Sequence, residues 1–228
     1  MSLSRPTANK ILLTCACIAG AFAMLLGVSA APALAYSNPP AAKSSTPPST
    51  TSPSTKTSTG CPAASVSQPF RSLGDEASYF PVPGGTFEEG TAGWSLTNAT
   101  IGTGNESYNV VGGTHSLAIA PNGIAVSPAF CVSKEDPSLR LFARQTSGSW
   151  AVLNVILRWQ ESSGATHETT VGSLQSGTAW KLSPVLALAS SLPMWQPGES
   201  VTVQVVLKPE QYGGAWAVDD VFADPRMR

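Results

Sequence analysis

Apolar residues recur at every second position in several segments of this chain. In residues 201–207 (VTVQVVL) they occupy positions 201, 203, 205 and 207, and residues 153–159 (LNVILRW) alternate in the same way. Successive side chains of a strand point to opposite faces of a sheet, so this spacing predicts strands with one buried face. Because most apolar positions in residues 61–228 follow it, we predict an all-β domain there, an antiparallel β-sandwich of the jelly-roll kind.

Shorter strands are predicted between clusters of Gly, Pro, Asn and Ser, at residues 116–120, 124–130, 139–144, 166–171 and 215–222. In the third of these, positions 139, 141 and 143 share one face, whereas Arg140, Phe142 and Arg144 share the other. Residues 91–98 and 182–192 could be helical instead, although Gly93 and Pro184 limit both.

The first 35 residues have the pattern of an export signal. Arg5 and Lys10 precede an uncharged, mostly apolar run over residues 11–31, and a small-x-small motif ends at Ala35. This order is typical of a cleaved secretory signal peptide, so we expect a secreted, extracellular protein, which could remain associated with the cell surface. The alternative is an uncleaved anchor, since the apolar run is long enough to cross a bilayer, and only then would the chain contact a membrane.

Residues 36–60 are dominated by small and polar residues. They contain 7 Ser, 6 Thr and 5 Pro, a composition that cannot bury enough apolar surface to offset chain entropy. We therefore predict a disordered linker, which either holds the domain away from the cell envelope or is only a tolerated tail.

Two of the 4 cysteines remain after removal of the signal peptide, because Cys15 and Cys17 leave with it. An even pair in an exported chain predicts a disulfide between Cys61 and Cys131. In the loop-entropy description such a bridge stabilises the domain by about 4 kcal/mol. Two free thiols are the alternative.

Charge and motif content argue against several function classes. A formal net charge of -1 gives no attraction for nucleic acid, and only 2 His leave little material for a histidine-based triad or metal site. No nucleophile elbow, His-Glu-x-x-His motif or phosphate loop is present. The acidic pairs at 88–89 and 219–220 are adjacent in sequence, so on a strand their members point to opposite faces. We expect no catalytic activity, and a monomer.

Four short motifs resemble the galactose-binding-like jelly rolls of many carbohydrate-binding modules. They are Gly84-Gly-Thr-Phe-Glu88 followed by Gly93-Trp94, the segment Gly113-Thr-His-Ser-Leu117, and the final Trp216-Ala-Val-Asp-Asp-Val221 with Asp224-Pro225. The chain is also similar to a broad group of secreted bacterial proteins, through Ser67-Gln-Pro-Phe and residues 127–131 (SPAFC). These resemblances cover residues 61–228 and imply the fold more firmly than the function.

In such jelly rolls the early Glu and the late Asp pair often approach each other and share a structural calcium ion. The resemblance therefore implies a possible calcium site at Glu88, Asp219 and Asp220, completed by carbonyl oxygens near Gly85 and Thr114. The alternative is that these acids cap turns or meet Arg side chains and backbone N–H groups.

Aromatic side chains are the candidates for glycan binding, because a ring face complements the C–H face of a pyranose. We expect Trp94, Trp159, Trp180 and Trp216 to be core residues. The candidate ligand-binding residues are Phe142, Trp150, Trp195 and Tyr212, with Arg144 and Arg158 as hydrogen-bond donors. They predict a non-catalytic domain that binds an extracellular glycan or cell-envelope polymer. A structural or adhesion domain without sugar binding is the main alternative, and an accessory domain of a hydrolase is a weaker one.

Overall fold

The computed structural model describes residues 61–134, 136, 138–161, 163–175, 177–193, 199–211 and 213–224. The predicted signal peptide and linker, and the candidates Trp195 and Tyr212, lie outside these residues. No helix within the described ranges has the length and hydropathy that crossing a membrane requires.

Nearly all of the regular secondary structure in the described chain is antiparallel strand. The long ones are β2 (Ser95–Thr103), β3 (His115–Val126), β5 (Ser138–Gln145), β6 (Leu153–Gln160), β7 (Thr166–Leu174), β10 (Ser200–Pro209) and β11 (Trp216–Asp224). Short strands are β1 (Phe80–Pro81), β4 (Phe130–Ser133), β8 (Lys181–Leu182) and β9 (Leu186–Ala187), and two 3-10 turns are η1 (Arg71–Leu73) and η2 (Ala189–Ser191). The predicted all-β class is confirmed.

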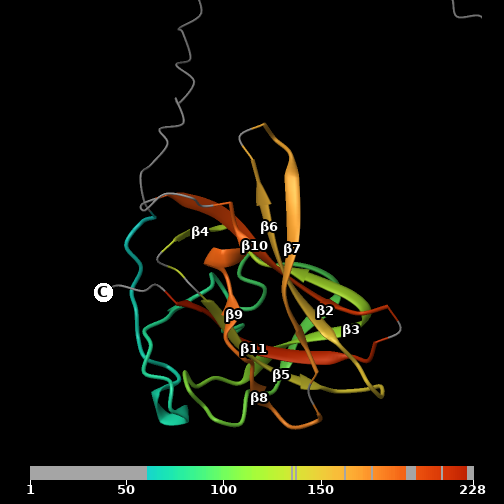
Figure 1. Cartoon of the computed structure of the whole chain (residues 1–228). Helices are drawn as coiled ribbons and strands as arrows, with labels where there is room; N and C mark the ends of the chain where they lie inside the picture. The colour runs from blue at the N-terminus through green and yellow to red at the C-terminus, as the bar shows by residue number, and fades with distance from the viewer. Residues whose placement is uncertain are drawn as a thin grey trace, which may run out of the picture. The chain divides into compact units, whose positions relative to one another are not determined.

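The strands form one curled sheet whose two halves face each other. The hydrogen-bonded order is β7-β6-β10-β3-β11-β5-β8, with β1 added to β11, β2 to β3, β4 to β10 and β9 to β5. In Figure 1, β6, β7 and β10 lie in the upper part of the view, and β5, β8 and β11 lie in the lower part. We refer to these as the upper and lower layers.

The hairpin of β2 and β3 joins the two layers because both strands bend. The first half of β3 pairs with β11, whereas Ala125 and Val126 pair with β10. At the bend, Asn98 and Asn122 have positive φ values of 47° and 60°, a region that asparagine tolerates better than most residues. Gly123 lies against the partner strand here, and a Cβ atom on it would be 2.5 Å from the carbonyl oxygen of Asn98.

Replacing Gly123 with alanine is expected to destabilise the domain, because the added methyl group meets backbone atoms that cannot move away. A collision of this kind costs about 1–3 kcal/mol, which lowers the unfolding midpoint by roughly 2–12 °C. The matched control is Gly102→Ala in the same hairpin, where a Cβ atom would meet nothing within 4 Å. Thermal unfolding of both variants checks this; equal midpoints would contradict the role given to Gly123.

The main core lies between the layers and follows the predicted alternation. Leu139, Leu141 and Ala143 of β5 share it with Leu153 and with other inward residues of β6, β10 and β11. Trp94, Trp180 and Trp216 are buried, and Trp159 is partly buried against the core, so the prediction that these four are core residues is confirmed.

A second apolar cluster covers the outer face of the lower layer. Phe142 of β5 and Phe222 of β11 meet Phe70 and Tyr79, which come from the segment before β2, with Phe70–Phe142 ring centroids 5.9 Å apart. Trp180, next to β8, belongs to the same cluster. The chain's own early segment therefore covers part of a face that the sequence pattern left open to solvent.

Of the two stretches that could have been helical, residues 91–98 contain no helix and residues 182–192 contain one short turn. Residues 91–98 form a turn and the start of β2, because Ala92 and Gly93 have positive φ values of 40° and 87° that no α-helix contains. Residues 182–192 hold β8 and β9, and only η2 is helical. The predicted strands at 116–120 and 124–130 are also joined differently, as β3 runs through to Val126 and β4 begins at Phe130.

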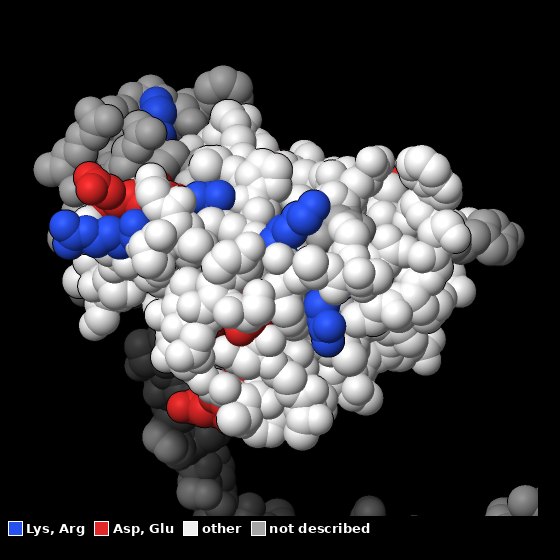
Figure 2. Space-filling view, turned by 90° about the horizontal axis from the view of Figure 1, so that it is seen from below, with Lys and Arg blue, Asp and Glu red and all other residues white. Residues whose placement is uncertain are grey.

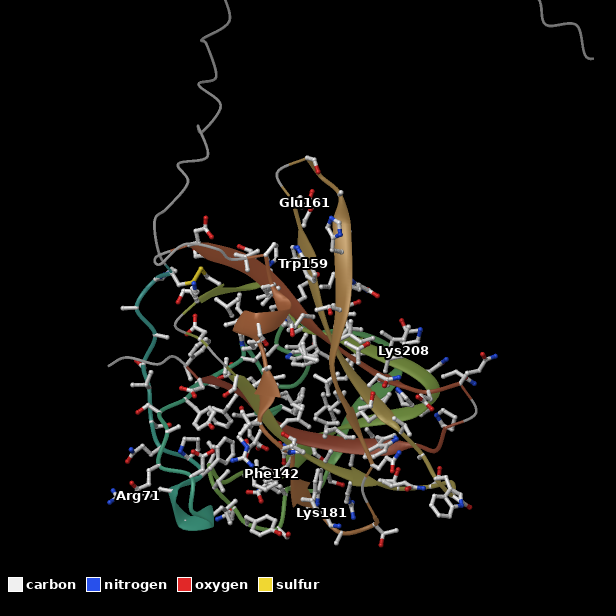
Figure 3. All side chains as sticks on the ribbon, in the orientation of Figure 1. Arg71, Phe142, Trp159, Glu161, Lys181 and Lys208 are labelled. Carbon is white, nitrogen blue, oxygen red and sulfur yellow. A yellow bond between two sulfur atoms is a disulfide. The ribbon has the colours of Figure 1, made fainter. Side chains whose placement is uncertain are left out.

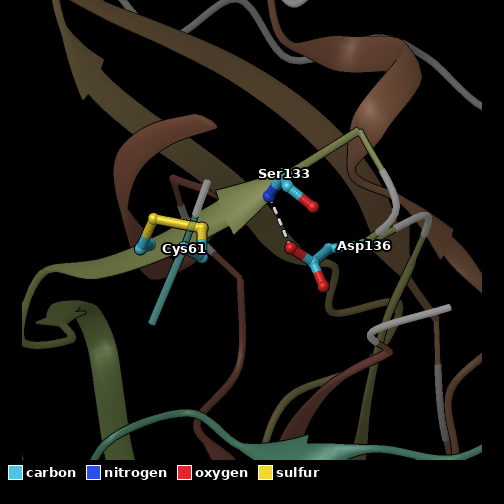
Figure 4. Close-up of a disulfide and its surroundings, with 4 residues drawn as sticks. Cys61, Ser133 and Asp136 are labelled. Atoms are coloured by element: carbon cyan, nitrogen blue, oxygen red, sulfur yellow. Dashed lines mark hydrogen bonds between the residues drawn. A yellow bond between two sulfur atoms is a disulfide. The ribbon is translucent and has the colours of Figure 1, made fainter. Parts of the chain in front are cut away.

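The predicted disulfide is present in the structure. Cys61 and Cys131 are bonded, with Cα atoms 5.5 Å apart and 70 residues between them in sequence. Cys131 lies on β4, and the loop after β4 is closed by a hydrogen bond from the Ser133 N–H to the Asp136 carboxylate (Figure 4). The bridge ties the first described residue to the upper layer.

Candidate functional site

The first candidate region is the uncovered part of the outer face of the lower layer. Phe142 is fully buried, so it presents no ring to solvent, which contradicts the expectation that it stacks on a ligand. Tyr108, from the loop between β2 and β3, covers it with ring centroids 5.3 Å apart and planes 22° apart. Tyr108 is itself 47% exposed. The outward ring on this face is therefore Tyr108, and Phe142 supports it from below.

Arg144 follows Phe142 by two residues on β5 and so shares its face. Its guanidinium carbon lies 5.0 Å from the centre of the Trp180 ring, a cation–π contact that fixes the side chain. The Arg144 Nε atom is buried and has no hydrogen-bond partner among the described residues. This face thus carries a half-exposed ring, which stacks on Phe142, and a guanidinium that Trp180 positions.

Loop 105–110 is held in place by Glu106. The Glu106 carboxylate accepts hydrogen bonds from the N–H groups of Tyr108 and Val110, the latter at 2.6 Å. The Glu106 N–H donates in turn to Asp219 Oδ2 on β11 at 3.0 Å. These bonds fix the backbone on either side of Tyr108, so its ring is presented on a braced loop.

Trp150 stands on the loop between β5 and β6 and is 95% exposed. It has a positive φ of 62°, and this loop is braced by hydrogen bonds between Ser147 or Thr146 and Ala215. Trp150 therefore remains a candidate ligand-binding residue. Among the described residues its ring stacks on no other aromatic ring.

Arg158 lies on the other layer and does not join Arg144. It is on β6, where it alternates with core residues, and its guanidinium pairs with Glu168 of β7 at 2.7 Å. Trp159 stacks on His167 with centroids 5.5 Å apart, near the end of the same hairpin. Figure 3 shows Trp159 and Glu161 on the raised β6–β7 hairpin, far from Phe142 and Lys181 at the lower layer. The two arginines that the sequence offers as hydrogen-bond donors therefore lie on different layers.

The surface of the lower layer carries few charges. Figure 2 looks at the molecule from that side and shows scattered basic and acidic side chains separated by wide uncharged surface. A polyanion needs closely spaced cations, so this surface suits an uncharged polar ligand better.

The second candidate region is a cluster of four acids, Glu88, Glu106, Asp219 and Asp220. Glu88 Oε1 accepts hydrogen bonds from the N–H groups of Thr114 and His115 at 2.9 Å and 2.8 Å, and its Oε2 lies 3.3 Å from the His115 ring. Asp219 and Asp220 sit at a bulge of β11, where Asp220 has a positive φ of 49°. Both are buried, and Asp220 Oδ2 has no hydrogen-bond partner among the described residues.

Burial and mutual repulsion shift the pKa values of the acids in this cluster. Burial raises the pKa of Asp219 to about 7, opposed by hydrogen bonds from two backbone N–H groups and assisted by the charges of Glu106 and Glu88. Burial raises the pKa of Asp220 to about 8, together with the negative charges of Asp219, Glu106 and Glu88. Burial also acts to raise the pKa of Glu88, but the hydrogen bonds from His115 and Thr114 outweigh it and lower that pKa.

The cluster fits a cation only in part. The negative charges of Glu88 and Asp219 help to raise the pKa of Asp220, and Asp220 Oδ2 is a buried acceptor without a hydrogen-bond partner among the described residues. However, no group of three or more His, Cys, Asp or Glu side chains within the described ranges is arranged to hold a metal ion. The carbonyls of Gly85 and Thr114 already accept backbone hydrogen bonds. An ion here would need main-chain oxygens and water for most of its ligands.

The same acids are poorly placed for acid–base catalysis. Asp219 is 0% and Asp220 2% exposed, so no substrate reaches them in this conformation. Glu88 is more exposed, but its carboxylate is engaged by the loop at residues 114–115.

Sequence reasoning missed two residues of the candidate site, Tyr108 and Glu106. Tyr108 was missed because it lies in a polar loop outside every strand pattern. A single aromatic residue in such a loop, between Gly104 and Gly112, is the signal that could have found it. Nothing in the sequence connects Glu106 with Asp219, which is 113 residues away.

Comparisons with known proteins find similarity in solved structures. Searches of protein-family models and of curated proteins find no match. The CBM22-1 xylan-binding domain of Paenibacillus barcinonensis Xyn10C is 16% identical, covers 61% of this chain and 90% of its own, and has a TM-score of 0.44. The module TmCBM61, in complex with β-1,4-galactotriose, is 14% identical over 63% of this chain and 96% of its own, with a TM-score of 0.38.

An enzyme domain is also among the similar structures. The enzymatically active domain of tailspike protein 4 from bacteriophage CBA120 is 17% identical over 63% of this chain and 21% of its own, with a TM-score of 0.43. Carbohydrate-binding modules are thus among the structures that this chain is similar to, in line with the sequence resemblance. None of these identities or scores is high enough to transfer a ligand or a residue's role.

Proposed function

We propose that this chain is an exported, non-catalytic domain that binds an extracellular glycan or envelope polymer. The observation that carries the proposal is Tyr108, a half-exposed ring stacked on the buried Phe142. A ring held flat on a second ring loses little freedom when a sugar stacks on its outer side, so binding costs less entropy.

Arg144 supplies the polar part of the proposed site. Its guanidinium is already positioned by Trp180, and donors fixed before binding give affinity more efficiently than mobile ones. Sugar hydroxyls and ring oxygens are suitable acceptors for it. The largely uncharged surface seen in Figure 2 supports a neutral glycan over a polyanionic one.

Replacing Tyr108 with alanine is expected to weaken glycan binding about tenfold, the equivalent of about 1.4 kcal/mol of lost stacking. Tyr108→Phe retains the ring and should keep most of the affinity. Isothermal titration and depletion on insoluble polysaccharide measure this, with xylan and β-1,4-galactan as first probes, since similar modules are described with such ligands. Unchanged binding in the alanine variant would remove Tyr108 from the site.

Trp150→Ala is the second arm of that experiment. If Trp150 contributes an independent contact, its loss adds to that of Tyr108, because distant sites contribute additively. Val66→Ala is a control at an exposed apolar residue, 38% accessible, in the segment before β1. A folded wild-type protein that binds no plant, fungal or bacterial polysaccharide would favour the structural or adhesion alternative.

We also propose a structural calcium ion at the acidic cluster, with Asp219, Asp220 and Glu88 as its side-chain candidates. Two observations support this second proposal. Asp219 and Asp220 are adjacent buried acids, and within the described part of the chain no group donates a hydrogen bond to Asp220 Oδ2. Calcium prefers oxygen ligands and would compensate the buried negative charge. The ion would fix β11 against the loops at residues 105–110 and 113–115, and so would support Tyr108 indirectly.

Export is the remaining part of the proposal, and it rests on the signal pattern of residues 1–35. The protein recovered from the culture medium is expected to begin at Tyr36. Intact-mass spectrometry decides this. A chain that keeps its first 35 residues in the membrane fraction would show an uncleaved anchor instead.

A further inference from the structure

Arg144 differs from the other two arginines of β5 and β6 in having no acidic partner. Arg140 forms an ion pair with Asp75. Arg158 forms one with Glu168. Within the described part of the chain, no acid pairs with the Arg144 guanidinium and no oxygen accepts a hydrogen bond from it. Because a guanidinium stays protonated in proteins, Arg144 carries a positive charge and hydrogen-bond donors that the fold itself does not use.

The neighbours of Arg144 on both sides of β5 are apolar. Ala217 of β11 lies opposite Arg144 in the register, and the Trp180 ring centre lies 5.0 Å from the guanidinium carbon. Both neighbours are buried, and Arg144 itself is partly buried. The Arg144 Nε atom is buried but the terminal nitrogens are not, so these are the donors that a ligand can reach. A charge in such surroundings attracts an opposite charge more strongly than a charge in open solvent does.

Two acids lie near this part of β5, and backbone N–H groups hold both of them. Asp219 accepts a hydrogen bond from the Glu106 N–H, and the Glu106 carboxylate accepts bonds from its own loop. Both acids are buried. On the other side of β5, the exposed Lys181 lies opposite Ala143 in the register. Of these charged groups, those that reach solvent, Arg144 and Lys181, are positive.

We infer that the glycan bound at Tyr108 carries a carboxylate, as a uronic acid does, and that Arg144 binds this group. Arg144 follows Phe142, on which Tyr108 stacks, by two residues of β5, or about 7 Å, so the ring and the charge can serve one ligand. A carboxylate offers two coplanar oxygens to the guanidinium N–H groups, a match of charge and geometry that a hydroxyl lacks.

This inference rests on the proposed glycan binding and narrows the ligand of that site. One positioned guanidinium needs one carboxylate, so the polymer is mainly neutral and carries acidic units at intervals. Such a ligand is in keeping with the sparsely charged surface in Figure 2, which does not suit a polyanion.

The test compares a xylo-oligosaccharide that carries one glucuronic acid unit with the methyl ester of the same compound, by isothermal titration against the full chain. The acid is expected to bind about tenfold more tightly than the neutral ester. This preference should shrink at high salt, because partly exposed charges are screened. Equal affinity for the two compounds, or tighter binding of the ester, would overturn this inference and leave the proposed glycan binding intact. Binding of neither compound would overturn both.

Variants then locate the carboxylate through the ratio of the two affinities. Arg144→Gln should bring this ratio from about ten to about one, whatever it does to binding of the ester. Arg144→Lys keeps the charge but loses the planar fork, and should keep a ratio of about three.

Two further variants are the controls for that ratio. Arg158→Gln changes an arginine of the other layer and should leave both affinities unchanged. Tyr108→Ala should weaken both compounds alike and keep the ratio near its wild-type value. A ratio that survives in Arg144→Gln, or that Arg158→Gln abolishes, would place the carboxylate elsewhere and overturn the assignment. Because both compounds are titrated against the same folded protein, a loss of stability in a variant does not imitate a change in the ratio.

Discussion

Replacing Asp220 with asparagine is expected to change the stability of this domain in opposite directions with and without calcium. Without calcium, the variant loses a buried carboxyl whose ionisation is disfavoured by burial and by neighbouring acids. Its midpoint should rise by about 4–8 °C near pH 8, on the order of 2 kcal/mol for a domain of this size. Asparagine tolerates the positive φ of 49° at this position, so the backbone needs no rearrangement.

With calcium, the same variant is expected to be less stable than the wild type. A neutral amide oxygen is a weaker calcium ligand than a carboxylate, and an ion that binds only the folded state stabilises it in proportion to its affinity. Calcium should therefore raise the wild-type midpoint by several degrees and that of Asp220→Asn by much less. Glu89→Gln, an exposed acid next to Glu88, is the matched control and should respond as the wild type does.

The pH dependence of the free energy of unfolding tests the same site independently. A carboxyl whose pKa is higher in the folded state than in the unfolded state holds its proton longer when folded, so stability falls as pH rises between the two values. For Asp219 and Asp220 this interval runs from their ordinary value of 3.8 to about 7 and about 8. The slope contributed by each group is at most about 1.4 kcal/mol per pH unit, and calcium should flatten it.

All of these effects can be measured by thermal unfolding of the wild type and Asp220→Asn. The measurements are made at about pH 5 and about pH 8, with calcium and with a chelator. A wild-type midpoint that calcium and chelator leave unchanged would exclude a tightly bound structural ion. A variant that is less stable than wild type even in chelator would show that the buried carboxylate stabilises the domain without a cation.

Replacing Cys61 and Cys131 together with serine is expected to lower the free energy of unfolding by about 4 kcal/mol. The 70-residue separation of the two cysteines makes the unfolded chain much less constrained when the bridge is absent. At this size the midpoint should fall by roughly 8–16 °C. Denaturant unfolding of the oxidised wild type, the reduced wild type and the double variant checks this.

Agreement between the reduced wild type and the double variant is the control for that experiment, because both lack the bridge. Full alkylation of the mature protein without reductant would contradict the disulfide itself. A double variant as stable as the oxidised wild type would show that β4 holds its place through β10 pairing alone.

Tyr108 and Phe142 show where sequence reasoning about the site succeeded and where it failed. The alternation in β5 correctly places Phe142 and Arg144 on the face opposite the core. It cannot show whether another segment covers that face, because periodicity reports only the direction of a side chain. The covering residues, Phe70, Tyr79 and Tyr108, come from segments outside β5.

The amino-acid sequence by itself determined the strand class, the two faces of β5, β6 and β10, the pairing of Cys61 with Cys131 and the burial of the four core tryptophans. These properties depend on local spacing, or on the choice among very few partners, and so can be derived from residue order. Only the tertiary structure decided that Arg144 and Arg158 lie on different layers, that Glu106 joins Asp219 across 113 residues, and that Tyr108 replaces Phe142 as the outward ring. Such contacts depend on how the β2–β3 hairpin bends and which loops fold over the lower layer. Their free energies come from interactions between residues far apart in sequence, which the spacing of residues within one segment does not report.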